Sequence, residues 1–267
     1  MRWVQDFPLE ARAASLFVET FKNVPDPVLF YTSSLSSNEG KIAWTLLGTV
    51  LFQGISYPSF DKLFSGLLEN FPGNKLWELP VPRGKELEQV VEETLGKTCW
   101  QLKEHFAGIF WSVGYFVRKH FPLTEWISTR TPKELWRDLG EIYFMGKKAY
   151  RPKANAAIYR LLSCTPYGLG FSTDLELNLP LPLTMGIRRY LAFMGPAKEE
   201  NFSEMSQGSK QKMADDFFSA ISKNAPIAAA HAFQFFLEYG KTKYLCCEYT
   251  DNCKKCPLQN YCKESEG

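Results

Sequence analysis

The sequence has no hydrophobic run long enough to span a lipid bilayer. Its longest apolar stretch covers residues 42–55 and is interrupted by polar residues, whereas a transmembrane helix needs about 20 apolar residues in succession. This stretch is instead predicted to form a buried core helix. An export signal is not apparent either, since acidic residues occur among the first ten and no clean apolar run follows. We therefore expect a cytoplasmic protein that does not contact membranes.

Charge of one sign and β-strand patterns are also scarce. The 31 basic and 29 acidic residues give a net charge of +2, which is too balanced to indicate a nucleic-acid partner by itself. The one alternating segment, residues 171–183, contains Pro180 and Pro182, which favour an extended connection over a sheet strand. Repeats and low-complexity tracts are absent, and 45% of the residues are hydrophobic, as is typical of a globular chain with a sizeable core.

Helical patterns dominate what is present. Ser36 and Glu39 have the spacing of a capping box directly before the long apolar stretch. Thr131 and Pro132 are typical of the N-cap and first position of another helix. Two segments carry apolar side chains at the i, i+3, i+4, i+7 spacing of one helical face: Phe60, Leu63, Phe64 and Leu67, and Ala154, Ala157, Ile158 and Leu161. These patterns predict an all-α fold.

Five of the seven cysteines lie within residues 246–262: Cys246, Cys247, Cys253, Cys256 and Cys262. An odd number of cysteines without an export signal favours a reducing compartment, where clustered thiols bind metal more often than they form disulfides. The spacing is C-x6-C-x2-C-x5-C from the first cysteine, or x5 in the first gap from the second. Structural zinc sites usually have two short knuckles and this segment has one, so a [4Fe–4S] cluster is favoured over tetrahedral zinc. Cys99 and Cys164 are expected to be core thiols.

The C-x6-C-x2-C-x5-C spacing resembles the iron–sulfur loop of the endonuclease III and MutY branch of the helix-hairpin-helix (HhH-GPD) DNA glycosylase superfamily. The preceding segment, "FFLEYGKTKYLC", is also similar to the family's approach to its first cysteine. The resemblance implies the ligand set Cys246, Cys253, Cys256 and Cys262. It further implies a two-lobed helical fold, with a six-helix barrel lobe over residues 39–164 and an iron–sulfur lobe formed by residues 1–38 and 165–267.

Two segments extend the resemblance into the barrel lobe. In "WTLLGTVLFQGISYPSFDKLFSGLL", Gln53 stands where the family has a glutamine near the extruded base; the alternative is a glutamine that caps a helix-end carbonyl. The segment "YFMGKKAYRPKANAAIYRLL" falls where the hairpin is expected, near residues 140–162, but keeps only Gly146 of the family's glycines. Five basic residues and no acid follow: Lys147, Lys148, Arg151, Lys153 and Arg160. Such clustered cations suit DNA phosphates; the alternative is a solvated helix face.

The residues at the family's catalytic positions differ. In "PLTMGIRRYLAFMG" the catalytic aspartate position is Thr184, whose hydroxyl carries no charge, whereas Arg188 keeps the family's arginine. The family's nucleophilic lysine falls on Pro152 in one register and on Lys153 in the other, and a phosphate contact is the alternative role of Lys153. The extra segment 171–178 brings Asp174 and Glu176 as candidate substitute acids.

The resemblance implies a monomeric, DNA-binding, base-excision-repair type glycosylase that flips a nucleotide out of double-stranded DNA and hydrolyses its N-glycosidic bond, with or without lyase activity. Lys254 and Lys255, between two cluster ligands, are expected to add positive charge near a phosphate. The missing aspartate favours an alternative, a catalytically inactive [4Fe–4S] nucleic-acid-binding protein on the same scaffold. An electron-transfer protein is a third reading, disfavoured because no second cofactor motif accompanies the cysteines.

Overall fold

The structure, a computed structural model, describes residues 26–52, 55, 57–72, 77, 84–96, 100–146, 151–163, 168–172, 183 and 204–221. The chain divides into two compact units, one with Pro27–Leu179 and the other with Met1–Asp26 and Pro180–Gly267. The described residues form helices connected by turns, and no β-strand occurs among them, as the all-α prediction requires. No helix in these ranges is long and apolar enough to cross a membrane.

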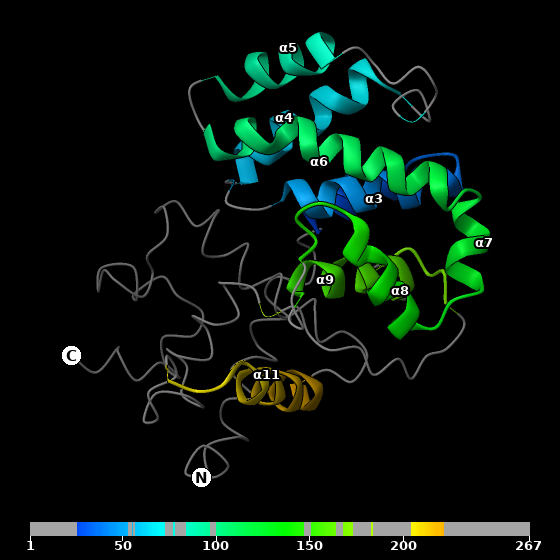
Figure 1. The fold of residues 1–267 in the computed structure, drawn as a ribbon, viewed down its shortest axis with the longest axis vertical. Helices are drawn as coiled ribbons and strands as arrows, with labels where there is room; N and C mark the ends of the chain where they lie inside the picture. The colour runs from blue at the N-terminus through cyan, green and yellow to red at the C-terminus, as the bar shows by residue number, and fades with distance from the viewer. Residues whose placement is uncertain are drawn as a thin grey trace. The chain divides into compact units, whose positions relative to one another are not determined.

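The unit Pro27–Leu179 contains these elements in chain order (Figure 1): α2 (Pro27–Thr32), α3 (Asn38–Leu51), α4 (Tyr57–Asn70), α5 (Gly84–Leu95), α6 (Trp100–Lys119), α7 (Leu123–Ser128), α8 (Pro132–Asp138), the 3₁₀ helix η1 (Leu139–Glu141) and α9 (Pro152–Leu162). The described part of the other unit contains α11 (Gln207–Ile221), in which Met213 and Ala214 are buried. The predicted boundaries of a barrel lobe at residues 39–164 and of a cluster lobe stay predictions.

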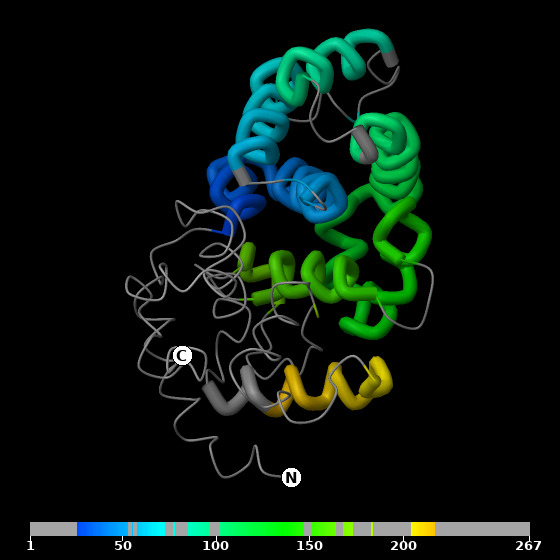
Figure 2. The backbone as a smooth tube through the Cα atoms, turned by 90° about the vertical axis from the view of Figure 1, so that its left-hand side faces the viewer, coloured from blue at the N-terminus to red at the C-terminus, as the bar shows by residue number. Residues whose placement is uncertain are grey.

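Helix α3 is the central element of the unit Pro27–Leu179. It contacts α2, α6, α7 and α9, and both views place it between α6 and α9 (Figures 1 and 2). Every residue from Ile42 to Leu51 is buried, which confirms the predicted core helix. Its N-cap is Ser37, whose hydroxyl accepts from Gly40 N at 2.9 Å, so the predicted cap at Ser36 was wrong by one residue.

Helix α4 contacts α5 and α2, and the face that its sequence predicted is buried. The side chains of Phe60, Leu63, Phe64 and Leu67 are all fully buried. Phe64 lies edge-on to Trp44 of α3, with ring centroids 5.5 Å apart. Burial of four large apolar side chains, each contributing about 1.5–3 kcal/mol, makes this face a main source of stability for the unit.

Glu39, the other half of the predicted capping box, caps a different helix. Its carboxylate accepts from the backbone N–H groups of Leu123 at 2.6 Å and Thr124 at 2.9 Å, and from the Thr124 hydroxyl. These groups are among the free N–H donors at the start of α7, where a negative charge is also favoured by the helix dipole. One side chain in the first turn of α3 therefore fixes the start of α7.

Candidate functional site

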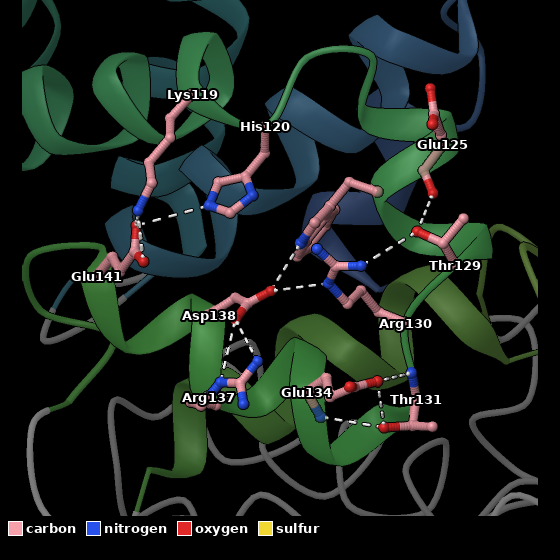
Figure 3. A network of polar contacts seen from close by, with 11 residues as sticks. Lys119, His120, Glu125, Thr129, Arg130, Thr131, Glu134, Arg137, Asp138 and Glu141 are labelled. Carbon is pink, nitrogen blue, oxygen red and sulfur yellow. Dashed lines mark hydrogen bonds and ion pairs between the residues drawn. The ribbon is translucent and has the colours of Figure 1, made fainter.

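The candidate site lies on the segment that joins α8 to α9, where the sequence predicts a hairpin. Helix α8 begins as predicted, because Thr131 and Glu134 form a complete capping box with Pro132 at the first position. The hydrogen bond from Thr131 N to Glu134 lowers the pKa of Glu134 below its ordinary value. Figure 3 shows this cap together with the polar contacts that hold the C-terminal end of α8.

Asp138 is the centre of those contacts. Only 8% exposed, it accepts a hydrogen bond from Trp126 Nε1 at 3.2 Å and pairs with Arg130 Nε at 3.5 Å and with Arg137 Nε at 3.4 Å (Figure 3). A buried carboxylate with these partners is compensated in charge. Asp138 therefore fixes α8 against the α7 region.

The 3₁₀ helix that follows is tied to the end of α6. Lys119 Nζ lies 2.7 Å from Glu141 Oε2, and this contact raises the pKa of Lys119. His120 Nε2 lies 3.5 Å from the same oxygen (Figure 3). The segment before the turn is thus held in place by two carboxylates: Asp138 at the end of α8 and Glu141 at the end of η1.

Arg151, a predicted DNA contact, folds back onto α8. Its Nη1 atom donates to the backbone carbonyl of Trp136 at 3.0 Å, and its guanidinium lies 4.2 Å from the Trp136 ring centroid. Gly140 makes room for it, because a Cβ atom at that position would collide with the guanidinium. A cation at the C-terminal end of a helix satisfies free carbonyl groups and the helix dipole. The described geometry thus gives Arg151 a role in holding the start of α9 against α8.

A tight turn at the tip precedes α9. Met145 N donates to Ile142 O at 3.1 Å, and both of these side chains are buried, so the turn is anchored in the core. Phe144 occupies the third turn position with φ +69° and Gly146 follows with φ +106°. Glycine is the usual residue at such angles, and a bulky side chain there is strained. The turn therefore holds an aromatic ring where the backbone would prefer none.

Lys153, the candidate nucleophile, is the second residue of α9, directly after Pro152. Its Nζ atom is buried without a hydrogen-bond partner among the residues that the structure describes, and it lies 5.5 Å from the centroid of the Phe144 ring. Burial lowers the pKa of Lys153 to about 7. An ammonium ion that has lost its water shell is disfavoured relative to the neutral amine. About half of the Lys153 side chains therefore carry a neutral, nucleophilic amine at pH 7.

The Phe144 ring beside this amine is packed against two other rings. The Phe144 ring lies 4.8 Å from that of His105 and 4.3 Å from that of Tyr143, between centroids. The backbone N–H of Tyr143 donates to Ser112 Oγ at 3.0 Å, which fixes the turn on α6. His105 thus supports the ring beside Lys153. Phe144 itself was missed, because no sequence signal indicates a phenylalanine with positive φ.

Arg160 differs from its prediction as a surface cation. It is 2% exposed, and its Nη1 atom donates to Thr49 Oγ1 of α3 at 3.0 Å. The apolar residues on the same helix are buried as predicted: Ala154, Ala157, Ile158 and Leu161. Arg160 therefore cannot contact a phosphate in this fold, because it faces the core.

The other predicted site residues lie outside the described ranges: Gln53, Lys147, Lys148, Asp174, Thr184, Arg188, Cys246, Cys253, Lys254, Lys255, Cys256 and Cys262. Within the described ranges, no three His, Cys, Asp or Glu side chains form a group that could hold a metal ion. The predicted cluster ligands therefore stay predictions. Of the predicted catalytic residues, the structure describes Lys153.

Comparison of the chain with protein-family models, with curated proteins and with solved structures gives no match.

Proposed function

We propose that this protein binds DNA and acts on the sugar of a flipped nucleotide through the amine of Lys153, as a glycosylase-like enzyme with lyase activity. The observation that carries the proposal is the buried, unpartnered Nζ atom with a pKa of about 7. Enzymes that form Schiff bases lower the pKa of their lysine by the same means, because only the neutral amine attacks carbon. A lysine that served only as a phosphate contact would gain from being charged and exposed.

The reaction needs few groups besides the amine. The lone pair of Nζ attacks C1′ of the deoxyribose, and the base leaves with the electrons of the N-glycosidic bond. At an existing abasic site, Nζ attacks the open-chain aldehyde instead, and the carbonyl oxygen leaves as water after proton transfer. In the first route the product is an aminal, which loses a proton from Nζ as the C1′–O4′ bond breaks and O4′ takes up a proton, so that the sugar ring opens. Both routes then give the same imine, and loss of a C2′ proton to water expels the 3′ phosphate by β-elimination. Since burial favours the neutral amine, the reaction depends less on a carboxylate to deprotonate it, which suits the presence of Thr184 at the position where the resemblance places the family's aspartate.

DNA binding is proposed from the position of this amine on the hairpin. Lys147 and Lys148 fall between Gly146 and α9 in the chain, where a hairpin can present them to the backbone phosphates of a duplex. The thiols of Cys246, Cys253, Cys256 and Cys262 are the donor set that a [4Fe–4S] cluster uses. When bound, the cluster would hold the loop that carries Lys254 and Lys255, and the proposed reaction does not pass through it.

Borohydride trapping tests the proposal. Purified protein is incubated with double-stranded DNA that contains one abasic site, and borohydride reduces any imine to a stable cross-link. Lys133 offers a matched control, since it is the second residue of α8 after Pro132 and is exposed. We expect the cross-link with the wild type and with Lys133→Ala, and its loss with Lys153→Ala. Binding without a cross-link in any of the three would overturn the enzyme and support the alternative, a catalytically inactive binding protein.

A further inference from the structure

The turn at Phe144 places a bulky aromatic side chain at a backbone position that favours glycine, and turn chemistry alone does not explain this choice of residue. With Met145 N bonded to Ile142 O, Phe144 is at the turn position that favours glycine, and its φ of +69° lies in the left-handed region. A phenylalanine is retained there although glycine would fit without strain. Strain of this kind is kept where the side chain has a task that the surroundings enforce.

The Phe144 ring is positioned to cover the amine of Lys153. Its centroid lies 5.5 Å from Nζ, and the ring is held by His105 at 4.8 Å. A ring face at this distance attracts an ammonium ion, which by itself favours the charged form and raises the pKa of a lysine. The pKa of Lys153 is nevertheless lowered, and burial is the cause. The effect of burial therefore outweighs the attraction of the ring for the cation.

We propose that Phe144 is a positioning residue that keeps Lys153 in its neutral form, by holding an aromatic ring over Nζ from a strained turn. The inference deepens the proposed function and rests on it for its biological meaning, but it concerns a property of the free protein.

The test is the pH profile of amine labelling in the full-length protein without DNA. Acetic anhydride is added over pH 5–11, and mass spectrometry measures the labelling of Lys153 and, in the same sample, of Lys133. The midpoint of each profile reports the pKa, whereas the amplitude reports access. Phe144→Gly removes the ring at a position whose backbone angle suits glycine, so the turn is expected to form. Phe144→Tyr keeps a ring and serves as the conservative variant.

We expect a Lys153 midpoint near 7 in the wild type and in Phe144→Tyr, and a midpoint at least about one pH unit higher in Phe144→Gly. The neutral fraction at pH 7 then falls from about one half to about one tenth or less. A midpoint near 7 in both Phe144→Gly and wild type would overturn the inference and leave the proposed function standing. A raised midpoint in Phe144→Gly with no borohydride cross-link in the wild type would uphold the inference and overturn the function. Midpoints of about 10 in all three proteins would overturn both.

Discussion

Arg160 donates a hydrogen bond from Nη1 to the hydroxyl oxygen of Thr49 at 3.0 Å, and both side chains are 2% exposed. This bond joins α9, which carries the candidate nucleophile, to the central helix α3. Hydrogen bonds that involve a charged group contribute about 1.5–3 kcal/mol, more than those between neutral groups. The position of α9 therefore depends on a polar contact inside the core.

Thr49→Val should destabilise the protein by about 1–3 kcal/mol, because it removes one acceptor from a buried guanidinium and keeps the side-chain shape. Thr45→Val is the matched control, since the Thr45 hydroxyl donates to Thr32 Oγ1 at 3.0 Å in a neutral pair and should cost about 1 kcal/mol. Urea denaturation followed by circular dichroism measures both. Equal losses for the two variants would show that the charge on Arg160 contributes nothing to this bond.

Glu39→Ala should lower the free energy of unfolding by about 1–2 kcal/mol, because the first N–H groups of α7 lose their charged acceptor. Glu39→Gln keeps one carbonyl oxygen and should lose less than Glu39→Ala. Asn38→Ala, one residue earlier in α3 and exposed, controls for the change of sequence at the start of that helix. Thermal melting checks the order, and a Glu39→Ala variant as stable as wild type would contradict the cap.

Lys153→Met should stabilise the protein, and the gain should depend on pH. The folded-state pKa of Lys153 is lowered to about 7 from 10.5, so the folded protein bears the full cost of a buried ammonium below pH 7. That cost fades as pH rises from 7 towards 10.5, where the unfolded chain also becomes neutral. We expect a gain of about 1–3 kcal/mol at pH 6 and little at pH 10. Denaturation at both values checks it, and a gain that is independent of pH would contradict the depressed pKa.

Protein purified without oxygen should contain about four irons per chain and absorb in the blue–violet region, as a [4Fe–4S] cluster does. Cys253→Ser should lose this absorbance, because it removes one of the four predicted ligands. Cys247→Ser should keep it, because Cys247 is predicted to be spare. Metal analysis and absorbance measure both variants, and stoichiometric zinc in place of iron would show that the spacing was misinterpreted.

Features set by neighbouring residues could be predicted from the sequence, and contacts between distant segments could not. The buried face of α4 and the capping box at Thr131 follow from spacing within one or two turns. The role of Glu39 could not be predicted, because its partner Thr124 is 85 residues away and hydrogen-bonds only after both helices pack. Ser37 and Ser36 are equally good caps by type, and the helix start decides between them.

In the candidate site, too, features set by neighbouring residues could be predicted and contacts between distant segments could not. Lys153 could be named from the register of a resemblance, but the ring that lies 5.5 Å from its Nζ atom comes from the preceding turn and could not be predicted. Arg160 appeared in the sequence as one more cation of a basic cluster, yet its partner comes from α3. The number of basic residues in this cluster therefore overestimates how many of them can contact phosphate from the surface.

Helix α3 has a consequence for how the unit Pro27–Leu179 opens. Because it contacts α2, α6, α7 and α9, its backbone amides reach water only when several neighbours separate from it. Local fraying cannot expose the middle of this helix, so amide hydrogen exchange there should require the largest free energy of opening in the unit. The amides of Trp44 to Val50 would then exchange at the rate set by global unfolding, and α3 would serve as an internal gauge of the stability of the whole unit.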